Sequence, residues 1–264
     1  MTEHSPGVEL VVDGLTIRFG GLTAVEGMSF GVRTGEVLSL IGPNGAGKTS
    51  AFNAITGYIE PDGGTIAYRG SPLNGLKPDQ IAERDLVRTF QKTSVFMGQT
   101  VVDNVLFGLH LASRQRPLAI VFGLPSVARE ERELAQEARR ILGFIGLEKR
   151  GALLASSLPY GELRLLEVAI ALAAKPKLLL LDEPVSGMNP SETASFMKML
   201  GQIRALGITV LLVEHDMKMV MGVSDRVICL NHGRIIASGS PAQIQGDPEV
   251  IRAYLGERYM RAQG

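Results

Sequence analysis

The chain has 264 residues with 27 basic and 27 acidic side chains, and this balance argues against a general nucleic-acid binder. Its 31 glycines and 45% apolar residues are typical of a glycine-punctuated α/β protein, and its single cysteine excludes an internal disulfide. The first residues lack a basic start followed by an apolar stretch, and no apolar run reaches the roughly 20 residues that span a bilayer. We therefore expect a soluble protein of a reducing compartment, with a flexible N-terminus over residues 1–7.

The N-terminal part of the chain is predicted to form strands around one helix. Residues 8–41 alternate apolar and polar positions around Gly14, Gly20–Gly21, Gly27 and Gly35, which indicates short strands with turns at the glycines. The last of these strands, Val37–Ile41, leads directly into a glycine-rich loop, and a helix is expected over Lys48–Ile55 because Gly57 stops it. Further short strands are expected at Gly64–Tyr68 and Leu86–Phe90.

The rest of the chain is predicted to alternate strands and helices after a helical stretch. From about residue 100 to 175, apolar residues recur at helix spacing. Lys177–Leu181 is a continuous apolar run, as expected for a parallel strand covered on both faces. A helix beginning at Pro190, a strand over Ile208–Val213, a helix from Asp216 and a strand near Val227 follow. This order predicts a parallel-sheet core interrupted by a helical insertion, with an antiparallel N-terminal layer.

The glycine-rich loop has the composition of a phosphate-binding loop. It comprises Gly42, Pro43, Asn44, Gly45, Ala46, Gly47, Lys48 and Thr49, and Ser50 follows it. The loop comes after a strand and opens a helix, which is the context that distinguishes a phosphate loop from an ordinary glycine turn. Its glycines let the backbone approach phosphates closely, and the helix N-terminus adds a partial positive charge. Lys48 is expected to reach the β- and γ-phosphates, and Thr49 to ligate Mg²⁺.

Three polar residues follow predicted buried strands later in the chain. Asp182 and Glu183 come directly after consecutive leucines, and His215 lies just past Ile208–Val213. The ends of central parallel strands face the ligand crevice of an open sheet, which favours functional roles over solvated carboxylates and an ordinary histidine. We expect Asp182 to hold the Mg²⁺ shell, Glu183 to polarise the attacking water, and His215 to contact the γ-phosphate.

Three other residues have a default interpretation that is purely structural. Phe19 could be a core aromatic, but its place before the phosphate loop suits stacking on adenine, an interaction of about 1–3 kcal/mol. Gln91 follows Leu86–Phe90 and would count as an ordinary polar residue without the other motifs. Cys229 lies in an apolar run and is predicted to be a small buried hydrophobe.

In their order, these motifs resemble those of the nucleotide-binding subunit of ABC transporters, and the resemblance covers nearly the whole chain. Phe19 matches the family's aromatic loop, Gly42–Thr49 its Walker A, Gln91 its Q-loop, Leu158–Glu162 its signature, Leu178–Glu183 its Walker B, Ser186–Asn189 its D-loop and His215 its switch histidine. The resemblance implies a P-loop NTPase with a RecA-like parallel sheet core, an N-terminal antiparallel β layer and an inserted α-helical subdomain at about 92–175. All of these would belong to one domain over 8–264.

The same resemblance implies that two subunits bind ATP and Mg²⁺ between them, head to tail. The catalytic residues would be Lys48, Gln91, Glu183 and His215, with Thr49, Gln91 and Asp182 around the metal ion. Tyr160, Gly161 and Glu162 of the signature would contact the ATP held by the partner subunit. Residues of the Q-loop and the helical subdomain would receive a membrane subunit.

More narrowly, three stretches are similar to the importer class for branched-chain and other hydrophobic amino acids. They are Phe19–Val25, the Tyr-Gly-Glu signature and the closing Ala253–Gly256, and the segment from Gln99 to Arg140 is similar too. This class implies two transmembrane permease subunits, a periplasmic binding protein, and a homodimer or a heterodimer with a related ATPase. The chain would then lie peripherally at the cytoplasmic face of the inner membrane.

Other functions use similar sequences. Import of urea or short amides and export of lipopolysaccharide employ similar ATPases, and the ATPase itself does not contact the cargo. A soluble regulatory ABC ATPase usually carries two cassettes or a long coiled coil, and neither is present here. A small-molecule P-loop kinase would lack both Leu158–Glu162 and His215.

The signature departs from the family pattern at Pro159, where serine is usual. Proline is acceptable in a first helical turn, but it supplies neither a hydroxyl nor an N–H group. The remaining donors are the N–H groups of Tyr160 and Gly161, together with a helix dipole worth about 0.3–1 kcal/mol. We therefore hypothesise that Pro159 weakens the closed ATP sandwich. The D-loop also departs, because it ends in Asn189 where aspartate is usual.

Overall fold

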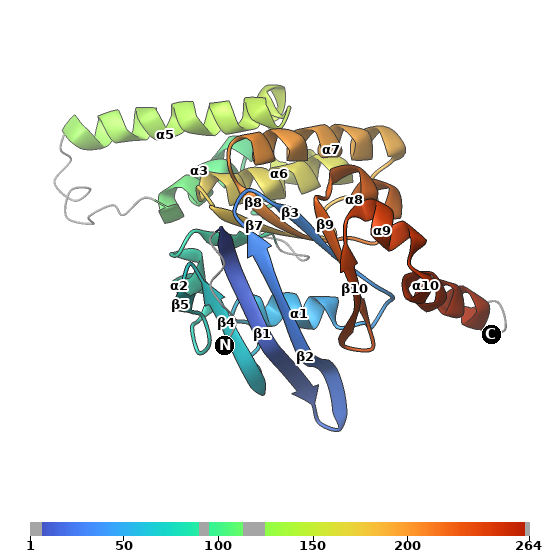
Figure 1. The fold of residues 1–264 in the computed structure, drawn as a ribbon. Coiled ribbons are helices and arrows are strands. Elements are labelled where there is room, and N and C mark those ends of the chain that lie inside the picture. Colours follow the sequence, from blue (N-terminus) through green and yellow to red (C-terminus); the bar gives the residue numbers. More distant parts are fainter. Residues whose placement is uncertain (1–6, 90–94, 113–124, 262–264) are drawn as a thin grey trace.

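The computed structural model describes residues 7–89, 95–112 and 125–261, which form two β-sheets with helices between and around them (Figure 1). The strands are β1 Val8–Phe19, β2 Leu22–Arg33, β3 Val37–Ile41, β4 Gly63–Tyr68, β5 Ser71–Pro72, β6 Leu86–Arg88, β7 Leu178–Asp182, β8 Thr209–Val213, β9 Arg226–Asn231 and β10 Arg234–Gly239. The helices are α1 Lys48–Ile55, α2 Pro78–Ala82, α3 Val101–Ala112, α5 Pro125–Phe144, α6 Tyr160–Ala173, α7 Pro190–Ala205, α8 Met217–Val223, α9 Pro241–Gly246 and α10 Pro248–Arg261, with 3-10 turns at Glu148–Arg150 and Ala155–Ser157.

The N-terminal layer is an antiparallel sheet in the order β2-β1-β4-β5, as predicted. The prediction of short strands over 8–41 was wrong, because β1 and β2 each run for 12 residues as one long hairpin. Gly14 and Gly27 were interpreted as turns. They have φ values of +63° and +60° and lie within the paired strands, where the register between β1 and β2 shifts. A bulge accommodates such a glycine without ending the strand.

The second sheet has the order β10-β9-β3-β8-β7-β6, and its neighbouring strands are parallel except for β10 on β9. Strands β3, β7 and β8 are buried along their whole length, as their apolar sequences require in a sheet covered on both faces. Asp182 belongs to β7 itself, one residue beyond the predicted strand. Cys229 lies buried in β9, which confirms the sequence prediction.

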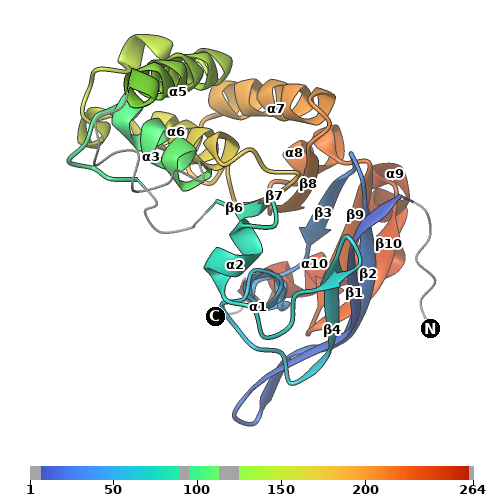
Figure 2. The same cartoon turned by 90° about the vertical axis from the view of Figure 1, so that its left-hand side faces the viewer.

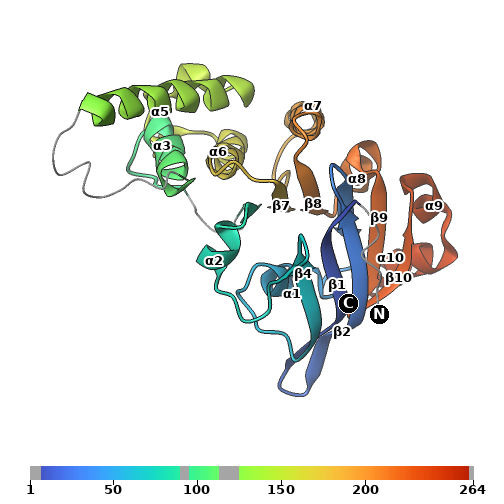
Figure 3. The ribbon, with the colours of Figure 1, turned by 60° about the vertical axis from the view of Figure 1, so that its left-hand side comes forward.

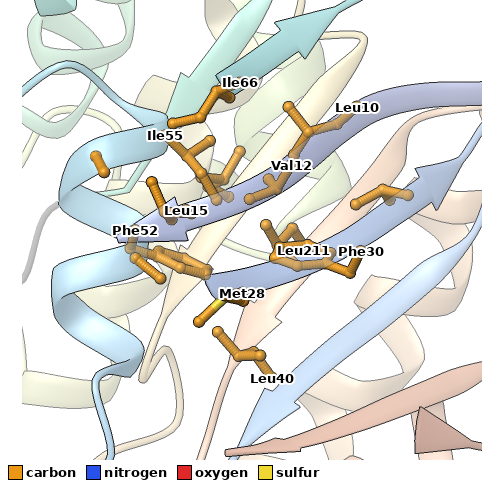
Figure 4. Packing of buried hydrophobic residues seen from close by; sticks show 14 of the residues in the cluster. Leu10, Val12, Leu15, Met28, Phe30, Leu40, Phe52, Ile55, Ile66 and Leu211 are labelled. Carbon is orange, nitrogen blue, oxygen red and sulfur yellow. The ribbon is translucent and has the colours of Figure 1, made fainter. Parts of the chain in front are cut away.

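Helix α1 lies between the two sheets. Phe52 and Ile55 of this helix pack in one cluster with Leu15 of β1 and Met28 of β2, and Leu40 of β3 closes the cluster from the other sheet (Figure 4). The residue pattern of α1 therefore positions the phosphate loop, because the buried face of the helix is held from both sides.

Helices α3, α5 and α6 gather on one side of the molecule, apart from the antiparallel layer (Figures 2 and 3). Ala138, Leu142 and Ile145, at the predicted helix spacing, are buried there. Within the described residues, no helix combines the length and apolarity needed to cross a membrane. The predicted strand at Leu86–Phe90 is observed over Leu86–Arg88, and its last residue lies outside the described ranges, as does the apolar stretch 118–124.

Candidate active site

The phosphate loop connects β3 to α1 by a path that requires glycine at two positions. Gly42 has φ +146°, and a Cβ there would lie 2.2 Å from the carbonyl oxygen of Leu230 in β9. Gly47 has φ +101°, and its Cβ would lie 2.4 Å from the carbonyl oxygen of Ala24 in β2. The loop is therefore packed against both sheets, and a side chain at either position would displace it.

Lys48 points back into the loop. It is buried, and Nζ donates to the carbonyl oxygens of Gly42 at 2.6 Å and Pro43 at 2.9 Å. Gly47 is the N-cap residue of α1 and has no side chain that could cap the first N–H groups of the helix. An ammonium group and a helix N-terminus at one place provide what an anionic phosphate chain needs.

A cleft of about 430 Å³ opens beside this loop. It is lined by Phe19, Leu22, Thr23, Ala24, Gly45, Ala46, Gly47, Lys48, Thr49, Ser50 and His232. Phe19, at the end of β1, is 49% exposed, which leaves its ring accessible for the predicted stacking. Gly42, Pro43 and Asn44 lie outside this lining. The cleft brings an aromatic ring and the phosphate loop together, as a nucleotide site requires.

Asp182 and Glu183 stand side by side in the chain but in different environments. The buried Asp182 accepts a hydrogen bond at Oδ2 from Arg88 Nη2 at 2.8 Å. Its Oδ1 is also buried, and it has no hydrogen-bond partner within the part of the chain that the structure describes. Glu183 is partly exposed and has φ +48°, in the left-handed region that side chains rarely adopt. Such strain persists where the surrounding structure fixes it, and it is concentrated at functional sites.

His215 faces Glu183 across the ends of β8 and β7, and its Nδ1 lies 4.0 Å from Glu183 Oε1. The buried carboxylate of Glu214 holds both segments. It accepts the N–H of Val185 at 3.0 Å and the N–H of His215 at 2.9 Å. A third side chain thus brings together the two residues predicted to handle the attacking water.

The residues predicted to hold Mg²⁺ suit a metal ion that takes most of its ligands from phosphate and water. No group of three His, Cys, Asp or Glu side chains in the described ranges could enclose a metal ion. Asp182 offers one carboxylate oxygen that has no hydrogen-bond partner among the described residues, and the exposed Thr49 lines the cleft. Mg²⁺ is commonly held in this way, through one or two carboxylates and the substrate phosphates. Gln91, the third predicted ligand, lies outside the described residues.

The signature segment Leu158–Glu162 begins α6, and none of its residues lines the cleft. Helix α1 packs on one face of the six-stranded sheet and α6 on the other, since α1 joins the cluster of Leu40 and Leu211, whereas α6 joins that of Leu179 and Leu212. The signature of one chain is therefore separated from the phosphate loop of the same chain by the sheet.

The first turn of α6 is open. Pro159 is the N-cap residue and makes no side-chain hydrogen bond, and Tyr160 is 50% exposed. Glu162 pairs with Arg150 through Oε1 at 3.1 Å, while its Oε2 is buried without a hydrogen-bond partner in the described ranges. The N–H groups of this turn lack the side-chain cap that serine would offer in place of Pro159.

The signature packs on the D-loop of its own chain. A Cβ on Gly187 would lie 2.9 Å from Tyr160 Cε1, and a Cβ on Gly161 would lie 2.8 Å from Glu192 Oε1. Asn189 caps α7, and its side chain accepts the N–H of Glu192 at 3.0 Å. Asparagine therefore serves as the helix cap at the position where aspartate is usual.

Three residues at the site were not anticipated from the sequence. Glu214 did carry a signal, because it follows an apolar strand as Glu183 does. Arg88 ends a three-residue strand too short to be recognised as part of the site. His232 lines the cleft from the β9–β10 turn, where its φ is +46°, and nothing in the local sequence relates it to the phosphate loop.

Comparisons with known proteins match most of the chain. A family model described as ABC transporter matches residues 25–186, and one described as branched-chain amino acid ATP-binding cassette transporter matches residues 234–259. The chain is 44% identical over 249 residues to the high-affinity branched-chain amino acid transport ATP-binding protein LivG of Salmonella typhimurium, covering 94% of this chain and 98% of that protein. It is 43% identical, over the same shares, to the corresponding protein BraF of Pseudomonas aeruginosa.

Solved structures show the same fold. An ATP-binding cassette of an ABC transporter in its ADP conformation matches with a TM-score of 0.83 at 30% identity, covering 94% of this chain and 99% of that one. A dimeric bacterial ABC transporter cassette matches with a TM-score of 0.76 at 22% identity, covering 88% and 98%, and this likeness concerns the fold alone.

Proposed function

We propose that this chain, which belongs to the ABC transporter family and is an ATPase, powers the import of branched-chain or other hydrophobic amino acids. The observation that carries the mechanism is the 4.0 Å approach of His215 Nδ1 to Glu183 Oε1 at the ends of β8 and β7. Strand β8 pairs with β3, the strand that leads into the phosphate loop. The cargo is supported by the relatives, since LivG and BraF are both branched-chain amino acid transport proteins.

The phosphate loop holds ATP by charge and by backbone donors. Lys48 exchanges the carbonyl oxygens of Gly42 and Pro43 for oxygens of the β- and γ-phosphates, and the open first turn of α1 donates to the same anion. Phe19 stacks on adenine at the other end of the cleft. A Mg²⁺ ion held through Thr49 and Asp182 would neutralise charge on the β- and γ-phosphates.

Hydrolysis is an in-line attack of water on the γ-phosphorus. The Glu183 carboxylate accepts a hydrogen bond from that water and aligns its oxygen. His215 contacts the γ-phosphate and keeps Glu183 in position, while Glu214 holds the backbone of His215. ADP and phosphate are the products, and the chain contributes mainly positioning and charge stabilisation.

A second ATPase subunit completes each site. Because the sheet separates the signature from the phosphate loop within one chain, Tyr160 and Gly161 serve the ATP of the partner, either a second copy or a related subunit. Their N–H groups and the α6 dipole approach the γ-phosphate, and Glu162 fixes the turn through Arg150. Closure of the two subunits around ATP then drives the transport step.

The permease docks on an apolar patch formed by Phe96, Met97, Phe107, Leu153 and Leu154, whose exposed fractions are 57, 38, 39, 41 and 50%. Two contacts connect the segments that carry these residues. The rings of Phe96 and Phe107 lie 4.9 Å apart, and the N–H of Ser156, which follows Leu154 closely in the chain, donates to the Met97 carbonyl at 3.1 Å. Exposed apolar residues gathered in one patch mark interaction sites. Phe96 lies five residues after Gln91 in the chain, and a permease bound at the patch would act on the nucleotide site through that connection.

In the cell, the chain would lie at the cytoplasmic face of the membrane, bound to two permease subunits that receive cargo from a periplasmic binding protein. A nucleic-acid partner is not proposed, since 27 basic residues are balanced by 27 acidic ones. Transport itself provides the test. The chain is co-purified with its permeases, placed in proteoliposomes and supplied with the binding protein and labelled leucine. ATP-dependent leucine uptake is expected. Transport of urea, short amides or lipopolysaccharide in place of leucine would contradict the proposed cargo.

A further inference from the structure

Arg88 connects three elements around the nucleotide cleft. It ends β6, and its side chain is only 7% exposed. Nη1 donates to Asn53 Oδ1 of α1 at 2.7 Å and to Thr56 Oγ1 at 3.1 Å. Nη2 donates to Asp182 Oδ2, at the end of β7, at 2.8 Å. One guanidinium group thus ties the helix of the phosphate loop to the carboxylate proposed to hold the metal ion.

The surroundings of Arg88 hold the guanidinium in place. Its central carbon lies 5.6 Å from the ring centroid of Phe52 and 5.9 Å from that of Tyr58, within reach of cation–π attraction. A buried ion pair contributes little net stability, because the cost of removing both charges from water offsets their attraction. The pair with Asp182 is therefore better explained by the geometry that it fixes.

The two oxygens of Asp182 have different roles in this geometry. Oδ2 is occupied by Arg88, while Oδ1 is buried and has no hydrogen-bond partner among the described residues. We infer that Arg88 is a positioning residue that orients Asp182 and leaves Oδ1 for the hydration shell of Mg²⁺. This inference rests on the metal role of Asp182 in the proposed function. Partners that orient a metal-site carboxylate typically change metal affinity 10- to 100-fold when they are replaced.

An alternative role for Arg88 predicts the opposite change in metal affinity when the residue is replaced. If the guanidinium were only a counter-ion that neutralises Asp182 until the metal arrives, its removal would strengthen metal binding. Lysine also separates the two roles, because it keeps the charge but lacks the fork that reaches Asn53 and Asp182 together. If Arg88 is only a counter-ion, Arg88→Lys should retain the native metal affinity. If Arg88 is a positioning residue, Arg88→Lys should weaken metal binding.

The test measures metal binding on the full chain with Mn²⁺ as the probe. Binding of Mn²⁺ in the presence of saturating ADP is followed by electron paramagnetic resonance, and ADP binding is measured separately in EDTA. Arg88→Met and Arg88→Lys should each weaken Mn²⁺ binding by about 10- to 100-fold. Metal-free ADP binding should stay within twofold of the native chain. Unchanged or tighter Mn²⁺ binding would overturn the inference.

A double-mutant cycle tests whether Arg88 acts through Asp182. If it does, Arg88→Met combined with Asp182→Asn should bind Mn²⁺ no more weakly than Asp182→Asn alone, because the two effects share one path. Additive losses would overturn the inference. Mn²⁺ binding that is unaffected by Asp182→Asn would contradict the proposed metal role of Asp182, which is a different failure.

Two further variants control for structural damage. Arg226→Met removes another partly buried arginine, whose Nε lies 2.7 Å from Glu36 Oε1, and this pair is remote from the nucleotide cleft. The substitution should lower stability without changing Mn²⁺ affinity. Asn53→Ala is used if Arg88→Met fails to fold, since it removes one bond to the guanidinium and leaves the ion pair. It should weaken Mn²⁺ binding about two- to tenfold, the equivalent of one net hydrogen bond. An unchanged affinity in Asn53→Ala would count against the inference.

Discussion

The phosphate-loop side and the signature side of this chain differ in how far their side chains are buried and hydrogen-bonded within one chain. On the first side, Lys48, Asp182 and Glu214 are buried, and each makes hydrogen bonds with the elements around the cleft. On the second side, Tyr160 is half exposed and Pro159 caps nothing. Under the proposed function, the first half-site is therefore nearly complete within one chain, while the second would acquire its ligand only when a partner closes on it. A free subunit should bind nucleotide through the first half and hydrolyse it slowly.

The largest expected effect belongs to the preformed half. Glu183→Gln should reduce ATP hydrolysis about 10²- to 10⁴-fold, because an amide cannot accept the proton of the attacking water. Phosphate release measures the rate, and light scattering after gel filtration measures the ATP-bound dimer, which should accumulate. ADP binding is the control and should be unchanged. A rate that falls less than tenfold would place the decisive carboxylate elsewhere and remove the basis for calling this half complete.

The contact between the signature and the D-loop gives the next largest effect. Gly187 has φ +79°, and a Cβ there would lie 2.9 Å from Tyr160 Cε1. Gly187→Ala should cost about 1–2 kcal/mol in the free energy of unfolding from backbone strain alone. It should also displace Tyr160 and weaken ATP-dependent dimerisation.

The matched control for this substitution lies in α7. A Cβ on Gly201 would meet nothing within 4 Å in the described part of the chain, so Gly201→Ala should stabilise the helix by about 0.5–1 kcal/mol. Urea unfolding and the dimer dissociation constant are measured for both variants. Native dimerisation in Gly187→Ala would mean that the D-loop does not position the signature.

Pro159→Ser should have a smaller effect on ATP-dependent dimerisation than Gly187→Ala, and it should strengthen the dimer rather than weaken it. A serine at the N-cap adds a hydroxyl and an N–H to the open first turn of α6, and one added hydrogen bond is worth about 0.5–1.5 kcal/mol. The ATP-bound dimer should therefore tighten several-fold. The measurement is made in a Glu183→Gln background, which prevents turnover. If dimerisation and the ATPase rate of the native chain are both unaffected by the serine, the idea that Pro159 weakens the sandwich is wrong.

The sequence predicts the first half better than the second. Val37–Ile41 and Lys48–Ile55 are observed at the expected residues, because an apolar run, glycines and a helix start give independent local signals. The fold class follows from the same alternation. The glycines inside β1 and β2 led to the wrong prediction of turns, since the residue type alone does not distinguish a bulge from a turn.

Contacts between distant segments account for what the sequence did not indicate. Arg88 pairs with Asp182 across 94 positions, and Glu214 reaches Val185 across 29. Neither spacing has a periodic pattern. The packing of Tyr160 on Gly187 likewise depends on how α6 and β7 are placed by the sheet. Local patterns thus indicated the residues that we propose for the chemistry, whereas the residues that position them could be found only from the fold.

The smallest expected effect tests the rigidity of the preformed half. Cys229 is the chain's only cysteine and lies in β9, the strand that backs the phosphate loop. Burial raises the pKa of its thiol to about 12, with a further rise from Asp247 and an opposing effect from Lys48. A group whose pKa lies so far above neutral holds about 10⁻⁴ of its thiol as thiolate at pH 8, and only the thiolate reacts. Ellman's reagent should therefore leave the native chain unmodified with or without ATP, while urea-unfolded chain reacts at once. Rapid labelling of the native chain would show that β9 opens locally, and the phosphate-loop side could then not be a preformed half-site.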